Sequence, residues 1–366
     1  MIGTEPLILA VNPGTGSTKL GLFRAGALVA GETLRHPDES IRSPRMADQL
    51  PMRLAAVREF LGRAAPGETL SAAVGRGGLL GPVPAGTLRA TPEMAAELLR
   101  GPRGEHASNL GVPIALAVAA DHGCPAFTVD PVSVDELAPE ARPTGLAGAE
   151  RRSFAHALNI RAVARRHALD TGRGLESMRL VVAHLGTGVS LAALREGRMV
   201  DVVNPQDEGP FSGDRAGGVP VTAVVDMCFA PGAERGAVRR RLFGDGGLFS
   251  LLGTRDVREA IARAAGGDAA AVLVVEAMAY QVAKSIGAMA VALDGRVDAV
   301  ILTGGMAHQA GVVDPVRRRV DWIAPVVILP GEDELAALAD GALRVLSGEE
   351  EARDYEPPLV AREAVR

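Results

Sequence analysis

Two stretches of this 366-residue chain repeat one pattern of strand, glycine-rich turn and strand. The first has an apolar run at residues 7–12 and a Pro-Gly-Thr-Gly turn at residues 13–16, after which alternation of apolar and polar residues resumes. The second has an apolar run at residues 180–184 and a Gly-Thr-Gly turn at residues 186–188, followed by another strand pattern. Since such self-similarity indicates a duplicated structural unit, we expect two related α/β domains, in each of which helices cover a sheet.

The glycine turns indicate phosphate binding, because glycine lets backbone N–H groups approach an anion closely. A dinucleotide-binding GxGxxG turn leads into a helix, whereas residues 14–19 lead into a second strand. A P-loop requires GxxxxGK followed by Ser or Thr, and the sequence contains no such string. The remaining interpretation is a hairpin-type clamp, in which two turns from duplicated domains hold ATP between them.

The composition favours small-molecule partners over nucleic acid or a membrane, since the net charge is −5 and we find no basic patch. Cys124 and Cys228 form no CxxC pair, and the N-terminus resembles no secretory signal, so we expect a cytoplasmic protein. The apolar region 268–294 contains polar and charged residues, which favours a buried helix over a membrane span. Its apolar residues exceed one helix face, so we also expect a homodimer or larger homo-oligomer.

Eight segments of the chain resemble, in the same order, segments of butyrate kinases. They are NPGTGSTK (12–19), VGRGGL (74–79), FTVDPVSVDEL (127–137), HALNIRAVARR (156–166), AHLGTG (183–188), DEGPFSGDRAGG (207–218), TGGM (303–306) and PGEDEL (330–335). Butyrate kinases are similar to acetate kinases, which belong to the superfamily of acetate and sugar kinases, Hsp70 and actin. The resemblance implies a duplicated two-domain actin-like ATPase fold with ATP in the interdomain cleft.

The resemblance also implies the domain limits and the activity. Residues 1–152 would form an N-terminal acyl kinase domain, joined by the C-terminal segment 334–366, and residues 153–333 would form the nucleotide-binding domain. The expected reaction is reversible transfer of a phosphoryl group from ATP to butyrate, giving ADP and butyryl phosphate. Propionate, isobutyrate and branched-chain acids are alternative substrates. From other classes, an actin-like ATPase switch and a nucleotide-binding regulator remain alternatives.

Four residues carry the implied chemistry. A carboxylic acid is already ionised at neutral pH, so the site needs cations and donors rather than a general base. Arg76 would hold the substrate carboxylate, and Arg215, in a Gly-rich loop, would stabilise the transition state. His156 matches a histidine that donates to the transferring phosphoryl group, although a capping or packed histidine is the alternative. Asp130 would orient an arginine or the metal shell.

The nucleotide and its Mg²⁺ would be bound by residues from both repeats. Asn12 and Lys19 would face the phosphates at the first turn, and Asn12 and Asp333 would contact the metal. The alternative for Asp333, which has Glu332 and Glu334 on either side, is an ordinary partner of the helix dipole at the first turn of a helix. The remaining predicted nucleotide-binding residues are His184, Gly186, Thr187, Gly188, Asp256, Arg258, Gly304 and Gly305. The segment from Gly304 to His308 would cover the purine and the ribose. Surface charges are the alternative for Asp256 and Arg258, and His106 is a further loosely aligned candidate.

Two glycines after Arg76 bear on the length of the acid. Acetate kinases carry branched side chains at this place, whereas Gly77 and Gly78 carry none. We therefore expect Gly77 and Gly78 to leave space in the substrate pocket for a longer acyl group, which favours butyrate over acetate. The last helix is followed by an acidic tail, residues 349–358, that we expect to be poorly ordered.

Overall fold

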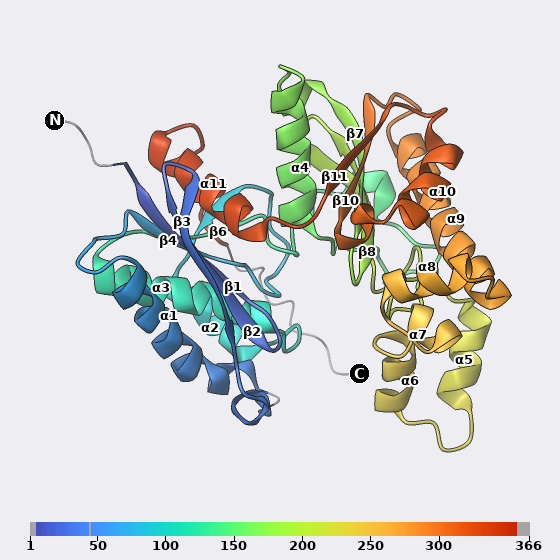
Figure 1. Cartoon of the computed structure of the whole chain (residues 1–366), viewed down its shortest axis with the longest axis horizontal. Helices are drawn as coiled ribbons and strands as arrows, with labels where there is room; N and C mark the ends of the chain where they lie inside the picture. Colours follow the sequence, from blue (N-terminus) through green and yellow to red (C-terminus); the bar gives the residue numbers. More distant parts are fainter. Residues whose placement is uncertain (1–4, 44, 357–366) are drawn as a thin grey trace. The chain divides into compact units, whose positions relative to one another are not determined.

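The computed structural model describes residues 5–43 and 45–356, which divide into two compact units (Figure 1). The N-terminal unit comprises Met1–Val134 with Asp333–Arg366, and the C-terminal unit comprises Asp135–Glu332. The first boundary lies earlier than the 152/153 limit that the sequence suggested. Residues 135–152 belong to the C-terminal unit because Ala138 N–H donates to the Val200 carbonyl at 2.8 Å and Arg151 pairs with Asp201 at 2.9 Å.

The N-terminal unit is built on a six-stranded mixed sheet in the order β3-β2-β1-β4-β6-β5. Its strands are β1 (Leu7–Pro13), β2 (Ser17–Arg24), β3 (Ala27–Arg35), β4 (Ala72–Gly75), β5 (Thr87–Arg89) and β6 (Ala126–Val129). β1, β2 and β3 form an antiparallel meander, whereas β1, β4 and β6 run parallel and β5 is antiparallel to β6. The carboxyl ends of the parallel strands therefore meet at the edge where the first glycine turn lies.

Helices cover both faces of this sheet (Figure 1). One face packs on α1 and α3 through a core that includes Leu9, Val11, Phe60 and Ile114, and α11 lies against the other face. The helices of this unit are α1 (Leu50–Ala64), α2 (Pro92–Arg100), α3 (Gly111–His122) and α11 (Glu334–Ser347), with short 3₁₀ turns at Asp38–Ile41, Met46–Gln49 and Ala107–Leu110.

The C-terminal unit repeats the same topology in a five-stranded sheet, ordered β11-β10-β7-β8-β9. Its strands are β7 (Arg179–Leu185), β8 (Val189–Arg195), β9 (Arg198–Val203), β10 (Ala299–Gly304) and β11 (Val326–Pro330). β7, β8 and β9 form an antiparallel meander, and β7, β10 and β11 run parallel. The repeated strand order confirms the duplicated α/β fold that the two glycine turns predicted.

The longest helix of the C-terminal unit is α9 (Ala269–Ala292), which begins where the Asp268 carboxylate accepts the N–H groups of Ala270 and Ala271. In the described part of the chain it is the one helix long and apolar enough to cross a membrane. It packs Met278, Val282 and other apolar residues into the core beside β7 and β8. The other helices are α4 (Ala157–Asp170), α5 (Val221–Phe229), α6 (Arg235–Leu242), α7 (Gly247–Leu252), α8 (Val257–Ala265) and α10 (Ala310–Val320), with 3₁₀ turns at Pro139–Ala141, Leu175–Ser177 and Gly305–His308.

The acidic tail is ordered over its described part. Arg353 N–H donates to the Thr87 carbonyl at 2.9 Å, and the Tyr355 hydroxyl donates to the buried Glu97 carboxylate at 2.9 Å. The expectation of a poorly ordered tail was therefore wrong for residues 349–356, because these backbone and side-chain groups pair with β5 and α2. Residues 357 and 358 lie outside the described residues.

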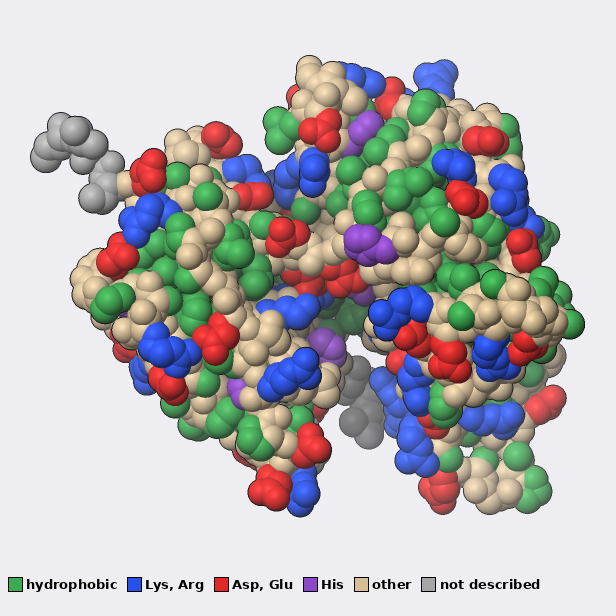
Figure 2. All heavy atoms as spheres, in the orientation of Figure 1, with side chains coloured by type: hydrophobic (Ala, Val, Ile, Leu, Met, Phe, Trp, Pro, Cys, Tyr) green, Lys and Arg blue, Asp and Glu red, His purple; other side chains and the backbone are tan. Residues whose placement is uncertain are grey.

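Charged side chains of both signs are interspersed over the visible face of each unit (Figure 2). The expectation of no basic patch has one local exception, because the last turn of α6 carries Arg239, Arg240 and Arg241 in succession.

Candidate active site

The first glycine turn joins β1 to β2 and places two predicted residues opposite one another. Asn12 and Lys19 are register partners in the antiparallel pair, with Asn12 buried and Lys19 exposed. An exposed lysine and a buried amide beside a glycine turn provide a cation and an oxygen ligand at one place. This arrangement suits an anion and its counter-ion.

Asn12 and Arg76 converge on the carboxylate of Glu334. Arg76 follows β4, which runs parallel to β1, so both residues lie at the carboxyl edge of the sheet. Asn12 Nδ2 donates to Glu334 Oε2 at 2.5 Å, and Arg76 Nη1 donates to the same oxygen at 2.6 Å. Glu334 is only 8% exposed. The three side chains therefore form one polar cluster at the first turn of α11.

Asp333, the predicted metal contact, is the N-cap residue of α11. Its side chain accepts the Ala336 N–H at 3.2 Å and so caps α11. Glu334, one residue later, is the acid that faces Asn12 and Arg76. Within the described residues, His, Cys, Asp and Glu side chains form no cluster of three that could hold a metal by themselves. A Mg²⁺ ion at this edge would therefore need phosphate oxygens as further ligands, as is usual for this ion.

Gly77 and Gly78 do not face open space. A Cβ atom on Gly77 would lie 2.5 Å from Pro131 Cβ, and one on Gly78 would lie 2.3 Å from Asn109 Oδ1 and 2.5 Å from Asn109 Cα. The expectation that their missing side chains leave room for a longer acyl group was wrong, because protein atoms already fill both positions. These glycines permit close packing of the chain after Arg76.

Two other predicted residues of this unit support local structure. Asp130 follows β6 with φ at +39°, an uncommon conformation for a residue with a side chain. Its Oδ1 accepts the Gly86 N–H at 2.7 Å, and its own N–H donates to the Gly86 carbonyl at 3.0 Å. His106 is exposed, and its Nδ1 lies 2.7 Å from the Ser108 hydroxyl at the start of a 3₁₀ turn. Asp130 thus holds the loop before β5, close in sequence to the Arg76 segment.

The second glycine turn, between β7 and β8, brings Gly188 against Arg215. A Cβ atom on Gly188 would lie 2.4 Å from Arg215 Nη1 and 2.7 Å from its Cζ, so the guanidinium lies directly on the turn. Ser212 Oγ donates to the Thr187 carbonyl at 2.5 Å, which ties the Gly-rich loop of Arg215 to the same turn. A cation placed on a glycine turn is suited to stabilise a phosphoryl group bound there.

Arg215 donates to no acceptor among the described side chains and carbonyls. Burial lowers the pKa of Arg215, and the neighbouring Asp214 carboxylate acts in the opposite direction. Burial also raises the pKa of Asp214. Since an arginine keeps its charge even so, the guanidinium offers a partly desolvated cation with all its donors available to a ligand.

His156 and His184 form a stacked pair beside this turn. Their ring centroids are 3.9 Å apart, with 13° between the ring planes. His156 Nδ1 lies 2.8 Å from Ser190 Oγ, and His184 Nδ1 lies 2.9 Å from Asn159 Oδ1. A Cβ atom on Gly186 would lie 2.7 Å from His184 Nε2, so the turn passes directly over the buried ring. The sequence suggested both histidines separately, and the structure brings them together.

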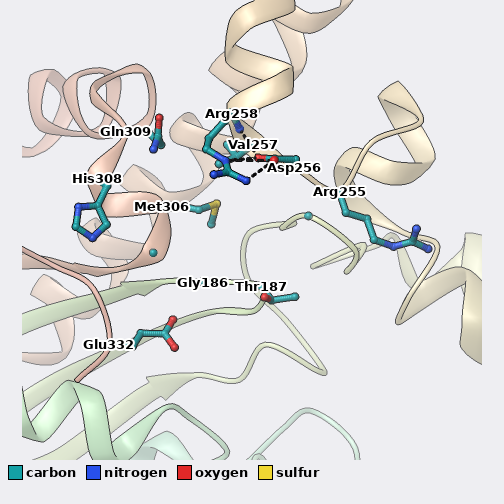
Figure 3. A pocket seen from close by; sticks show the side chains of 12 residues that line it. Gly186, Thr187, Arg255, Asp256, Val257, Arg258, Met306, His308, Gln309 and Glu332 are labelled. Carbon is teal, nitrogen blue, oxygen red and sulfur yellow. Dashed lines mark hydrogen bonds and ion pairs between the residues drawn. The ribbon is translucent and has the colours of Figure 1, made fainter. Parts of the chain in front are cut away.

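A cavity of about 550 Å³ opens beside the second turn (Figure 3). Five of the residues predicted to bind the nucleotide line it, namely Gly186, Thr187, Asp256, Arg258 and Gly305. Met306 and His308, from the predicted segment 304–308, also line it. So do residues that the sequence did not single out for the nucleotide, which are Gly213, Arg255, Val257, Gln309 and Glu332. The volume falls in the range of small-molecule sites. The only sequence signal for Arg255 and Glu332 was their position beside predicted residues.

Asp256 and Arg258 form an ion pair at the wall of this cavity (Figure 3). Arg258 Nη2 donates to Asp256 Oδ2 at 2.6 Å, and Asp256 Oδ1 accepts the Arg258 N–H at 2.9 Å to cap α8. The side-chain hydrogen bonds from Arg258, together with its N–H, lower the pKa of Asp256 to about 2. Asp256 is therefore ionised at neutral pH, and the pair presents a fixed polar surface.

Gly304 and Gly305 differ in their surroundings. Gly304 has φ at +89°, and a Cβ atom there would lie 2.5 Å from the Leu185 carbonyl oxygen, so only glycine fits where β10 ends against β7. Gly305 has no atom within 4 Å of its Cβ position and lines the cavity. Gly304 therefore shapes the turn, and Gly305 gives a ligand access to the backbone.

Comparison with known proteins connects this geometry to a family. Residues 148–322 match the Acetokinase family. This segment, which matches the acetokinase family, contains the second glycine turn, the stacked histidines, the Arg215 loop and most of the cavity lining.

Solved structures show the same fold over nearly the whole chain. The Porphyromonas gingivalis acetate kinase has 19% identity and a TM-score of 0.76, covering 92% of this chain and 99% of that one. A propionate kinase from Francisella tularensis subsp. tularensis SCHU S4 has 17% identity and a TM-score of 0.73, covering 91% and 98%. The Entamoeba histolytica acetate kinase has 16% identity and a TM-score of 0.74, covering 92% and 99%. The chain therefore has the two-domain, actin-like α/β fold that acetate kinases share.

Proposed function

We propose that this protein is a carboxylate kinase, which transfers a phosphoryl group between ATP and a short-chain carboxylic acid. The observation that carries the proposal is the placement of the Arg215 guanidinium on Gly188, within the segment that matches the acetokinase family and without an acceptor among the described residues. A glycine turn alone indicates phosphate binding. A desolvated arginine against it adds the charge that phosphoryl transfer requires.

The residues of this chain suit a direct transfer. One oxygen of the ionised acid attacks the γ-phosphorus, the bond to the bridging oxygen breaks and ADP leaves, so no proton needs to be removed from the acid. Arg76 would bind the acid carboxylate, with Glu334 orienting its guanidinium. Arg215 would neutralise charge on the transferring group, and His156, held by Ser190, would donate to it. Asp130 would position the loop at Gly86 rather than act as an acid or base.

A Mg²⁺ ion would be held by Asn12 and Glu334, whose amide and carboxylate oxygens are ligands of the kind that Mg²⁺ prefers. When bound, the ion would neutralise charge on the ATP phosphates. We propose Glu334 rather than the predicted Asp333 as the acidic ligand, because the Asp333 carboxylate is already used to cap α11.

The cavity of Figure 3 would take the nucleoside portion of ATP. Gly305 leaves backbone accessible, Met306 supplies an apolar contact, and His308, Gln309 and the Asp256–Arg258 pair offer polar groups to a base and a ribose. His184 and the turn at Gly186 would lie on the phosphate side, with the Gly186 backbone over the buried ring.

Among short-chain acids we propose butyrate, with propionate, isobutyrate and branched-chain acids as the alternatives. The support is the order of the eight segments that resemble butyrate kinases. Gly77 and Gly78 add no support, because protein atoms already fill the positions of their missing side chains. The preferred acid must therefore be determined by comparing kcat/KM over a series of acids.

The test is ADP release from ATP and Mg²⁺ with a series of straight-chain and branched acids from two to six carbons. We expect ADP release that depends on the acid, with kcat/KM highest for butyrate. Release with sugars and not with acids would refute the carboxylate kinase, and a maximum at acetate would refute the choice of butyrate alone.

A further inference from the structure

A buried arginine lies beneath the first glycine turn. Arg53 is on α1 and is fully buried, at 0% exposure. Its Nη1 donates to the carbonyls of Gly14 and Ser17 at 3.0 Å each, and its Nη2 donates to the carbonyl of Thr15 at 3.1 Å. Its Nε and Nη2 also donate to Gln49 Oε1, at 3.2 and 2.9 Å. One guanidinium thus holds most of the turn from below.

The charge of Arg53 is not balanced by a carboxylate of the described chain. All of its hydrogen-bond acceptors are neutral carbonyl, amide or hydroxyl oxygens, including Thr18 Oγ1 at 3.0 Å. Burial lowers the pKa of Arg53, with no acidic group raising it. His36, whose Nε2 lies 2.8 Å from Thr18 Oγ1, has its pKa lowered by burial and by the charge of Arg53. A buried cation without a counter-charge is costly unless an anion outside the chain supplies one.

The turn is oriented so that its donors remain available. The carbonyls of Gly14, Thr15 and Ser17 accept from Arg53, and that of Gly16 accepts the His36 N–H at 3.0 Å. Among the described groups, the backbone N–H groups of Thr15 and Gly16 have no acceptor. With the carbonyls held by Arg53, these two N–H groups remain available to an anion, as in the backbone concavities that bind phosphate.

We propose that Arg53 is a positioning residue for nucleotide phosphates: it fixes the first glycine turn with its N–H groups toward the ligand, and the bound polyphosphate balances its buried charge. The inference rests on the proposed function for the identity of the ligand as a nucleotide. The second turn is held differently, since there the neutral Ser212 hydroxyl binds the Thr187 carbonyl and the cation, Arg215, lies on the turn itself. The two repeats therefore supply charge to their turns in two different ways.

The test compares equilibrium binding of ATP and of adenosine to the full-length chain by calorimetry, in Mg²⁺ and without any acid. Arg53→Met removes the charge and the hydrogen bonds, and Arg53→Lys keeps the charge but cannot reach all the carbonyls at once. We expect the ratio of ATP affinity to adenosine affinity to fall about tenfold to hundredfold in Arg53→Met, the range for partners that orient ligating groups. In Arg53→Lys the ratio should fall several-fold, and adenosine affinity should be unchanged in both.

Arg161→Lys is the matched control. Arg161 is a buried arginine on α4, and it donates to the Gly197 carbonyl at 2.5 Å. Gly197 lies in the hairpin turn after β8, at the end of that strand away from Gly188. The Arg161→Lys change should lower the melting temperature without changing the ratio of ATP affinity to adenosine affinity. An unchanged ratio in folded Arg53→Met, or in Arg53→Lys if the methionine variant does not fold, would overturn the proposal. If the wild-type protein released no ADP in response to any acid, the proposed function would be overturned. The ratio of ATP affinity to adenosine affinity would still test the positioning role of Arg53.

Discussion

Gly188→Ala is the perturbation whose effect follows most closely from the geometry of the second turn. The new Cβ atom would lie 2.4 Å from Arg215 Nη1, whereas ordinary contacts of this kind begin at 3.4 Å. The guanidinium would therefore have to retreat by about 1 Å. The Arg215 guanidinium has no acceptor among the described residues, and it lies at the end of a flexible side chain. We therefore expect this shift to cost little stability of the fold.

The expected loss is in turnover. A misplacement of about 1 Å in a positioned group can lower the rate about 10²-fold, and complete removal of one stabilising donor costs about 10²- to 10³-fold. We therefore expect kcat to fall about 10²-fold in Gly188→Ala and up to 10³-fold in Arg215→Ala. In the double variant kcat should be no lower than in Arg215→Ala, because both changes act on the same guanidinium.

The assay is coupled ADP release at saturating ATP and acid, with the melting temperature measured in parallel. Gly62→Ala, in α1, is the control, because its Cβ position has no atom within 4 Å. A kcat for Gly188→Ala within about threefold of wild type, with Arg215→Ala strongly impaired, would refute the steric argument. Multiplicative losses in the double variant would show that Gly188 acts independently of Arg215.

Four further predictions concern both units. Gly78→Ala should destabilise the fold by about 1–3 kcal/mol through overpacking against Asn109 without changing the preference among acids, and an unchanged melting temperature would contradict this. Glu334→Gln should raise the Mg²⁺ concentration needed for half-maximal ADP release, as a Mg²⁺ titration would show; an unchanged dependence would remove Glu334 from the metal site. The pKa of His36 is lowered in the fold, so the unfolded chain binds more protons and stability should fall as the pH drops below the ordinary value of 6.5. His36→Gln should flatten the profile of melting temperature against pH in that region, and an equally steep profile would exclude His36 as the cause. Leu273, on α9, is 70% exposed, which suits an apolar contact with a second copy of the chain. Leu273→Glu should therefore convert the expected dimer to a monomer in light scattering. A monomeric wild-type protein would contradict the expected dimer.

The fold could be predicted from the sequence because its signals are local and repeated. Each copy reads as strand, glycine turn and antiparallel strand, and the same strand order recurs in both sheets. Such patterns depend on neighbours in the chain and on alternation, which a sequence displays directly. The resemblance of ordered segments to butyrate kinases also predicted Gly186 and Gly305, two of the glycines that line the cavity.

The details that sequence reasoning missed depend on side-chain direction and on contacts between distant segments. Asp333 and Glu334 are adjacent and both acidic, yet one caps α11 and the other meets Asn12 and Arg76. Nothing in the local sequence shows that Gly78 packs against Asn109, some thirty residues later in the chain. Arg53 is one of many arginines in the sequence, and only tertiary structure shows that it is buried beneath the first turn.

The most direct test of the central claim is to trap the acyl phosphate as a hydroxamate while ADP is measured in the same reaction. With wild-type protein, ATP, Mg²⁺ and butyrate, we predict hydroxamate and ADP in equal amounts, and neither product without the acid. ADP formation without hydroxamate, or at the same rate with and without acid, would show that the chain hydrolyses ATP or phosphorylates another acceptor and would contradict the carboxylate kinase.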